Sequence, residues 1–355
     1  MRRRYGGFDV LRIGAALAVV LSHSYAVTGH ARQNVAFWVG HFRVPLGSLG
    51  VGIFFIVSGF LVAGSWDRLD GARTFVRHRV ARIWPALTLT VVVTVVVLGP
   101  VVTSLNPAEY FSAHLTALYL VRNVTVFAGM VQFLPGVFRD HPVPWVNGSL
   151  WTLTYEVWAY VAVMTLGLLG LLRRRWVPVV VLVALLAFVR FAVYDHVGHL
   201  PVSRLILGLN IRNAAVLGAY FFAGVALSRF TDTFPPRRLL LSGLILLVLS
   251  FVVREPTLYV VGLAGCCIGL GAFDTSFTRG VHRLGDPSYG IYIFAFPIQQ
   301  LCWSGGIRTP VPMFFIVGAV VAALGYLSWH WVESPVLRRA RKVGREREAP
   351  RTVAP

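Results

Sequence analysis

The chain has 355 residues, of which 56% are hydrophobic and only 13% are charged. This composition excludes the pair of soluble domains that the length alone would suggest, because so much apolar surface is stable only in lipid. The formal net charge of +19 would suit nucleic-acid binding, but the arginines lie in short clusters between apolar segments. That is the positive-inside pattern of membrane proteins, so we expect a membrane protein with no nucleic-acid partner.

Ten apolar segments are long enough, or nearly long enough, to cross a bilayer as helices. They begin near Val10, Leu49, Trp84, Ser149, Trp176, Arg212, Arg238, Thr257, Ser288 and Val311. The first follows the cluster Arg2 to Arg4 but has no clear small-residue cleavage site, so we interpret it as an uncleaved span rather than a signal peptide. The sequence therefore predicts an all-α polytopic membrane protein with about ten transmembrane helices.

The segment from His114 to Leu134 is a weaker candidate for an eleventh span. It carries three polar residues that are costly in lipid, Arg122, Asn123 and Gln132. If it does not cross, the large arginine clusters all fall on one side of the membrane, and if it crosses, the later clusters change sides. We therefore expect both termini in the cytosol and the region 106–148 outside, partly helical or re-entrant.

The expected organisation is one membrane domain over residues 1–335 and a basic cytosolic tail over residues 336–355. Nearly all the basic residues are arginine, which is typical of a GC-rich bacterial genome, so we expect the inner membrane of a bacterium. The cysteines lie inside apolar segments, and the histidines of the expected outer loops lack a ligand-like spacing. We therefore predict neither a metal site nor redox chemistry.

The first expected span carries Arg12 and His23. Eleven residues at roughly 100° per residue place both side chains on one helix face, about 16 Å apart along the axis. Ionisable residues inside membrane spans are usually functional, so we expect an arginine near the cytosolic mouth and a deeper imidazole to line one tunnel. The alternative is an anchoring charge together with a histidine that only packs between helices.

Arg79 and Arg82 lie at the mouth of the third expected span. Three residues apart on a helix, they face the same way, and planar guanidinium groups bind phosphate oxygens in a bidentate manner. A nucleotide-bearing donor such as CoA would supply those phosphates. The alternative is simple anchoring by positive charge.

The fourth expected span begins with the polar sequence NGSLWTLTYE, residues 147–156. Ser149 and Glu156 fall on one helical stripe. A carboxylate about two turns inside a span needs a partner, and His23 or an arginine of the tunnel is the expected one. A structural ion pair between helices is the alternative role for this glutamate.

The ninth expected span begins with three hydroxyl side chains, Ser288, Tyr289 and Tyr292. Ser288 and Tyr292 lie one helical turn apart, where their hydroxyls would orient an acyl carbonyl or an acceptor. Interfacial tyrosines also occur as ordinary membrane-belt residues, so this motif is weak by itself.

Six motifs in a fixed order resemble those of the acyltransferase-3 family of integral membrane proteins, over nearly the whole chain. They are Arg12 with ten residues before His23, VGIFFIVSGFL at 51–61, R-x-x-R-x-x-P at 79–85, NGSLWTL-x-x-E at 147–156, SY-x-x-Y at 288–292 and WVESP at 331–335. The resemblance implies a ten-helix domain that moves an acyl group, commonly acetyl, from acyl-CoA to a hydroxyl of a glycan, lipid-linked sugar or similar acceptor.

The resemblance also implies roles for individual residues. His23 corresponds to the catalytic histidine and Glu156 to the buried acidic residue. The expected substrate-binding residues are Arg12, Arg79, Arg82, Ser149, Trp151, Ser288, Tyr289 and Tyr292. Many members carry a histidine shortly after the second tyrosine of the ninth span, where this chain has FAFP at residues 294–297. That departure places the chemistry on His23.

In the expected mechanism His23 removes the proton of the attacking hydroxyl, and Glu156 fixes its tautomer or stabilises its charged form. Acyl-CoA is the co-substrate, and no bound cofactor is needed because a thioester is already activated. Transient acylation of His23 is an open variant. The rival class is a transporter or flippase that uses intramembrane Arg, His and Glu, although the sequence has no inverted repeat typical of one.

The arginine asymmetry predicts that residue 139 faces away from the cytosol. In a variant with the three native cysteines replaced by alanine, Arg139→Cys should react with a membrane-impermeant maleimide in right-side-out vesicles. Arg175→Cys is the matched control, expected to react only in inside-out vesicles. Labelling of Arg139→Cys only in inside-out vesicles would contradict the ten-span topology.

Overall fold

The computed structural model describes residues 6–40, 42–69, 71–194, 205–206 and 209–348. Within these residues the chain is mainly helical, with two short antiparallel ribbons, β1 (Ala36–Val39) with β2 (Phe42–Pro45) and β3 (Leu205–Ile206) with β4 (Leu209–Asn210). The predicted all-α class is confirmed. The cluster Arg2 to Arg4 and the last seven residues of the expected basic tail, 349–355, lie outside the described residues.

Each of the ten apolar segments expected from the sequence forms a helix. They are α1 (Gly7–Val27), α2 (Leu46–Trp66), α3 (Gly71–Val93), α7 (Trp151–Leu168), α8 (Trp176–Phe188), α9 (Ile211–Ser228), α10 (Pro236–Val252), α11 (Pro256–Gly271), α13 (Ser288–Ser304) and α14 (Pro310–Ser328). The smaller α-helices are α4 (Gly99–Val102), α5 (Pro107–Ser112), α6 (His114–Thr125), α12 (Ser276–Arg283) and the basic α15 (Ser334–Glu348). Single-turn 3₁₀ segments are η1 (Ala31–Gln33) and η3 (Leu171–Arg173), and π-helical segments are η2 (Thr94–Leu98), η4 (Val189–Tyr194) and η5 (Trp329–Glu333).

Five helical stretches among the described residues are long and apolar enough to cross a membrane by themselves: Gly7–Val27, Leu46–Trp66, Gly71–Val102, Ile211–Ser228 and Pro310–Lys342. The number becomes six if α11 and α12, which meet at an angle of 87°, form one broken span. These helices support a multi-pass membrane protein. The number of ten spans and the cytosolic location of the termini stay predictions.

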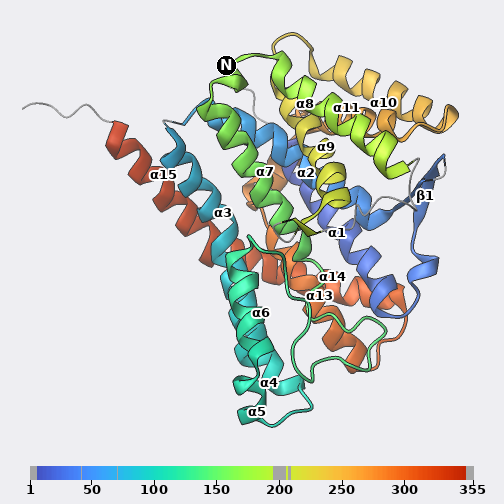
Figure 1. The fold of residues 1–355 in the computed structure, drawn as a ribbon, viewed down its shortest axis with the longest axis vertical. Coiled ribbons are helices and arrows are strands. Elements are labelled where there is room, and N and C mark those ends of the chain that lie inside the picture. The colour runs from blue at the N-terminus through green and yellow to red at the C-terminus, as the bar shows by residue number, and fades with distance from the viewer. Residues whose placement is uncertain (1–5, 41, 70, 195–204, 207–208, 349–355) are drawn as a thin grey trace, which may run out of the picture.

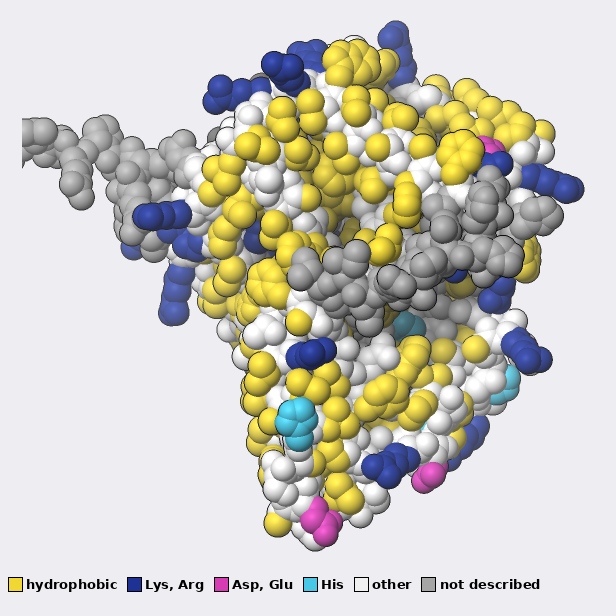
Figure 2. Space-filling view, in the orientation of Figure 1, with side chains coloured by type: hydrophobic (Ala, Val, Ile, Leu, Met, Phe, Trp, Pro, Cys, Tyr) yellow, Lys and Arg dark blue, Asp and Glu magenta, His cyan; other side chains and the backbone are white. Residues whose placement is uncertain are grey.

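Helix α1 packs against α2 on one side and against α13 and α14 on another (Figure 1). Helix α9 packs on α2, and the pair α10 and α11 forms an edge of the molecule with α8 nearby. On α10 the side chains of Leu241, Ile245, Val248 and Val252 are each at least 60% exposed. Exposed hydrophobic side chains spread over the visible upper surface (Figure 2). This is the surface of helices that face lipid rather than water.

The region 106–148 is partly helical, as predicted. Helix α5 begins with a capping box in which Asn106 and Glu109 bond to each other's backbone. Helix α6 has 12 residues, fewer than the roughly 20 needed to cross a bilayer. Beyond it the chain folds back, because the Asn123 side chain accepts from the backbone N–H of Val131 and donates to its carbonyl, both at 2.8 Å. Helix α6 therefore does not span a membrane by itself. The side of the membrane on which the region lies stays a prediction.

The crossing of α2 and α9 depends on two glycines. A Cβ at Gly59 would overlap the carbonyl of Phe221, and a Cβ at Gly224 would overlap the carbonyl of Ile56. The two backbones touch where the side chains are missing, which is the way that small residues bring membrane helices together. This contact fixes α2, and with it the residues that α2 contributes to the interior.

Gly59→Ala should separate α2 from α9 and lower the free energy of unfolding by about 1–3 kcal/mol, the scale of overpacking in a core. The measurement is the apparent melting temperature of the protein in detergent. Gly318→Ala is the control, because an added Cβ there meets no described atom within 4 Å apart from the adjoining residues and backbone of its own helix. Equal melting temperatures for the two variants would contradict the tight crossing.

Candidate active site

A cavity of about 1090 Å³ lies among α2, α3, α7, α13 and the segment η5. Seven of the ten predicted site residues line it: Arg12, Arg79, Arg82, Glu156, Ser288, Tyr289 and Tyr292. They come from α1, α3, α7 and α13, which are far apart in the sequence. The fold therefore brings most of the predicted polar residues to one space, which we call the main cavity.

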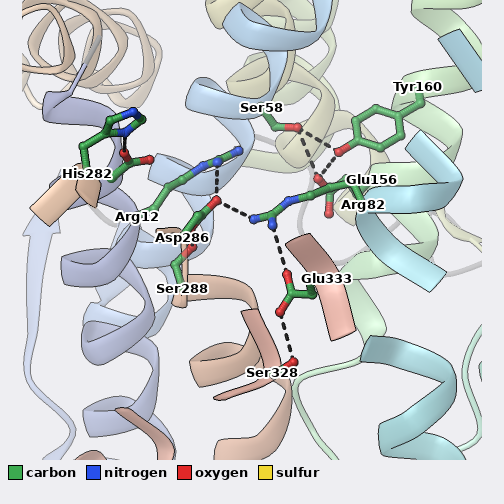
Figure 3. Close-up of polar contacts among 11 residues, drawn as sticks. Arg12, Ser58, Arg82, Glu156, Tyr160, His282, Asp286, Ser288, Ser328 and Glu333 are labelled. Carbon is green, nitrogen blue, oxygen red and sulfur yellow. Dashed lines mark hydrogen bonds and ion pairs between the residues drawn. The ribbon is translucent and has the colours of Figure 1, made fainter. Parts of the chain in front are cut away.

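Buried ion pairs hold one wall of the main cavity together (Figure 3). One oxygen of Asp286 accepts from Arg12 at 2.7 Å and from Arg82 at 2.6 Å, and its other oxygen accepts from the hydroxyl of Ser288. Arg82 also donates to Glu333 at 3.0 Å. Two positive and two negative charges thus cancel within one network, as buried charges require. We call these four charged residues the ionic network.

Local backbone structure brings the two carboxylates to the arginines. Glu333 ends the π-helical segment Trp329–Glu333, whose wider turn changes the direction in which the following side chains point. The side chain of Glu333 is fully buried and also accepts from Ser328 at 3.1 Å. Gly285 has a φ of 91°, and a Cβ there would overlap the indole of Trp329. A glycine before Asp286 thus lets this loop lie directly against the π-helical segment.

Glu156 makes its hydrogen bonds to groups that the sequence did not predict, although it also interacts electrostatically with Arg79 and Arg82. The predicted partner was His23 or an arginine of the tunnel, but the carboxylate accepts hydrogen bonds from Ser58 at 3.2 Å and from Tyr160. The guanidinium of Arg79 lies 5.6 Å from the ring centre of Tyr160. Glu156 is therefore part of a hydroxyl cluster beside a cation.

Arg79 and Arg82 line the same cavity, but they differ in how many of their N–H donors already have a partner. Arg82 is bound to two carboxylates. Arg79 has one long hydrogen bond, 3.4 Å to Ser65, and its Nε has no hydrogen-bond partner among the described residues. A buried guanidinium with unused donors is costly unless a ligand or water satisfies it. Arg79 is therefore the arginine of this pair that can bind a ligand without breaking an ion pair.

The remaining three predicted site residues, His23, Ser149 and Trp151, are not among those that line the main cavity. His23 packs edge-on against Phe296 with the ring centres 5.1 Å apart, and its Nδ1 is buried without a hydrogen-bond partner among the described residues. The Ser149 hydroxyl is also buried and unpartnered there. Trp151 lines a second, smaller cavity of about 340 Å³. The structure thus places Arg12 and His23 of one helix in different surroundings.

The segment NGS at residues 147–149 packs against α13 through a hydrogen bond and a close contact. Pro297 lies inside α13 and has no N–H, so the carbonyl of Ile293 four residues earlier lacks its helical partner. The side chain of Asn147 donates to that carbonyl at 2.9 Å. A Cβ at Gly148 would overlap the ring of Phe296. Asn147 and Gly148 therefore fix the start of α7 against α13.

Sequence reasoning missed three polar side chains around the main cavity, Ser58, Asp286 and Glu333. Ser58, Asp286 and Glu333 lie in or next to the quoted motifs, but as single residues they looked like ordinary loop or helix positions. Charge balance was the available signal. Two arginines near apolar spans require carboxylates, and few acidic residues are available in this chain.

A membrane protein with buried ionised groups around a large cavity is a suitable framework for group transfer inside the membrane, and comparison with known proteins identifies the class. Residues 5–330 match the family model described as an acyltransferase domain. The chain belongs to the acyltransferase-3 family, and it is an acyltransferase.

An O-acetyl transferase of Shigella phage Sf6 is 28% identical to this chain over 345 residues, which cover 94% of this chain and 96% of that protein. YrhL of Bacillus subtilis (strain 168), provisionally named a peptidoglycan O-acetyltransferase, is 26% identical over 93% of this chain and 54% of its own length. Nodulation protein 10 of Rhizobium leguminosarum bv. viciae is 34% identical over 174 residues, 48% of this chain and 45% of that protein. No solved structure matches the chain.

Asp286→Asn should destabilise the protein by about 3–5 kcal/mol, because it removes the ion-pair partner of Arg12 and one of the two carboxylates bound to Arg82. Arg12→Met added to Asp286→Asn should restore part of that loss, since Arg82 keeps Glu333. Apparent melting temperatures or detergent–denaturant unfolding would measure both effects. Asp274→Asn is the control. It removes the exposed partner of Arg279 and should cost less than about 1 kcal/mol. A double variant no more stable than Asp286→Asn alone would contradict the charge argument.

Proposed function

We propose that this protein is a membrane O-acyltransferase that moves an acyl group, acetyl in the first instance, from acyl-CoA to a hydroxyl of a glycan, lipid-linked sugar or similar acceptor. The observation that carries the proposal is the main cavity of about 1090 Å³, in which Arg79 keeps unused donors next to buried hydroxyl groups. The O-acetyl transferase name of the phage relative supports acetyl as the group transferred.

Arg79 is the residue that we assign to the phosphates of the donor. The main cavity is also lined by Arg68 and Arg341, whose positive charges attract anions. Arg82 contributes in another way. Its two carboxylate partners neutralise it, and the ionic network then keeps the wall of the donor site in place.

Hydroxyl groups near the inner end of the main cavity are suited to orient the acyl carbonyl. Thr152 of α7 and Tyr292 of α13 form a hydrogen bond of 2.7 Å. Tyr289 is committed, because its hydroxyl donates to the carbonyl of Ile83 at 3.0 Å. Ser288 is committed as well, because its hydroxyl donates to Asp286. Tyr292, whose partner is another hydroxyl, is the one of these groups that we assign to the reacting end of the donor.

His23 is the base in the proposed reaction. Its neutral imidazole takes the proton of the acceptor hydroxyl as the oxygen attacks the thioester carbonyl. The tetrahedral intermediate then breaks its carbon–sulfur bond, the ester is formed, and the CoA thiolate leaves with the proton from the imidazolium. The unpartnered Nδ1 of His23 supports this role, because a packing histidine would be expected to use its buried nitrogen in a hydrogen bond. Transient acylation of His23 is the variant in which the same thioester bond breaks first.

Topology and location belong to the same proposal. With ten spans and cytosolic termini, the arginine-rich mouth of the main cavity faces the cytosol, where acyl-CoA is found, and the membrane is the inner membrane of a bacterium. A transporter or flippase finds no support in the relatives, which are named for acyl transfer or nodulation.

Arg79→Ala should weaken CoA binding by about 1–3 kcal/mol, the scale of hydrogen bonds to charged groups, without loss of fold. The CoA affinity of Arg79→Lys should lie between those of the unsubstituted protein and Arg79→Ala, because an ammonium group keeps the charge but cannot bind phosphate in a bidentate manner. Titration calorimetry in detergent measures both. Arg73→Ala is the matched control, an exposed arginine of the same helix that does not line the cavity. Unchanged CoA affinity in Arg79→Ala would refute the donor assignment.

His23→Gln should lower the rate of acetyl transfer at least about 10²-fold while CoA affinity stays the same, since glutamine keeps hydrogen bonding but cannot accept the proton. Transfer is measured with radiolabelled acetyl-CoA and purified protein in detergent. His114→Gln, an exposed histidine of α6, is the control. An active His23→Gln variant would mean that the histidine is structural, and Glu156 would be the next base to test.

A further inference from the structure

The second cavity lies on the other side of α7 from the main cavity. Trp151, Thr154 and Tyr155 line the second cavity, whereas Thr152, Leu153 and Glu156, which alternate with them on the same helix, line the main one. The irregular segment before α7 and the start of α9 complete its wall with Gly129, Met130, Gln132, Trp145 and Asn213. One helix therefore separates the two cavities.

The side chains of the second cavity have the chemistry that recognises a sugar ring. Trp145, Trp151 and Tyr155 offer aromatic faces with negative electrostatic potential, against which the weakly positive C–H face of a pyranose stacks. Gln132 and Asn213 offer amide donors and acceptors for hydroxyl groups. A lipid chain would need no such amides, and a phosphate would need a cation, which the described lining of this cavity lacks.

One buried hydroxyl in this cavity has no partner. Thr154 is 1% exposed, and its Oγ1 makes no hydrogen bond within the part of the chain that the structure describes. A buried hydroxyl left unsatisfied costs about 1–3 kcal/mol. Since Thr154 lines the cavity, a ligand hydroxyl is a partner that would remove this cost.

The volume and the neighbours of the cavity fit the same ligand. The volume of about 340 Å³ lies at the lower end of the roughly 300–1,000 Å³ of small-molecule pockets, which suits a ligand of one ring. The ring of Trp145 lies 6.5 Å from that of Phe296, and Phe296 lies 5.1 Å from His23. A single aromatic ring thus separates the wall of this cavity from the imidazole to which we assign proton removal.

We propose that the second cavity is the acceptor site and binds one pyranose ring of the hydroxyl acceptor, stacked on Trp145 and Trp151 and hydrogen-bonded to Thr154. The proposal rests on the proposed function, because it supplies the acceptor for the transfer. The donor then lies on one side of α7 and the acceptor on the other, and the two meet near the start of that helix.

Saturation-transfer NMR tests binding without turnover, using methyl pyranosides of glucose, galactose, mannose and N-acetylglucosamine with the full-length protein in detergent. At least one glycoside should give ring-proton signals with the unsubstituted protein. Trp151→Leu and Trp145→Leu should reduce those signals at least about fivefold. Trp176→Leu is the control, because Trp176 is 68% exposed and lines neither cavity. CoA affinity, measured in parallel, reports whether each variant is folded.

Thr154→Val removes the hydroxyl at nearly constant shape. It should reduce the glycoside signal without lowering the melting temperature. If the Thr154 hydroxyl is simply unpaired and binds no ligand, Thr154→Val should be more stable and bind the glycoside as well as the unsubstituted protein. That result would overturn the role of Thr154. No glycoside signal with the unsubstituted protein, or equal signals in all the tryptophan variants, would overturn the acceptor site. Glycoside binding without acetyl transfer would instead keep this site and refute the proposed function.

Discussion

The need to pair buried charges is the constraint on which the rest of this structure depends. Asp286 joins Arg12 and Arg82, and Glu333 binds Arg82 from the opposite side. These four residues come from α1, α3, the loop before α13 and the π-helical segment after α14. In a low-dielectric interior none of them is stable alone, so helices from both ends of the chain must meet at one point. The main cavity lies beside that point.

Neutralisation also determines which groups are available for chemistry. Because Arg82 is bound to two carboxylates, the cationic side chains of the main cavity that remain available for a ligand are Arg79, Arg68 and Arg341. Glu156 is engaged with Ser58 and Tyr160 rather than with the ionic network. The interior is thus divided into a charged part that holds helices together and a less committed part that can bind ligands.

Much of the candidate site followed from the sequence because ionisable residues are rare in apolar segments and each one is informative. Arg12, Arg79, Arg82 and Glu156 were selected in this way, and all four line the main cavity. The ten helices likewise followed from hydropathy, although only five or six of them can be counted as spans from length and composition.

Partners could not be predicted, because they depend on contacts between distant parts of the chain. Asp286 and Arg12 are 274 residues apart, and neither local pattern points to the other. The helical-face argument placed Arg12 and His23 on one side of α1, but it could not show what covers each end of that side. One end meets Asp286 and the other meets the ring of Phe296. Neighbouring helices therefore decide the surroundings of each residue.

The proline of α13 has a consequence for how this family can vary. Pro297 frees the carbonyl of Ile293, and Asn147 satisfies it from another part of the chain. A helix without that proline would satisfy the carbonyl internally and leave the side-chain N–H of Asn147 without this acceptor, while its Oδ1 would still accept from the backbone N–H of Ser149. Positions 147 and 297 are thus linked, because the residue at 297 decides whether the Ile293 carbonyl is free to accept from the side chain at 147. In related sequences the asparagine and the proline should be gained or lost together, even though the two positions are far apart in the sequence and belong to different motifs.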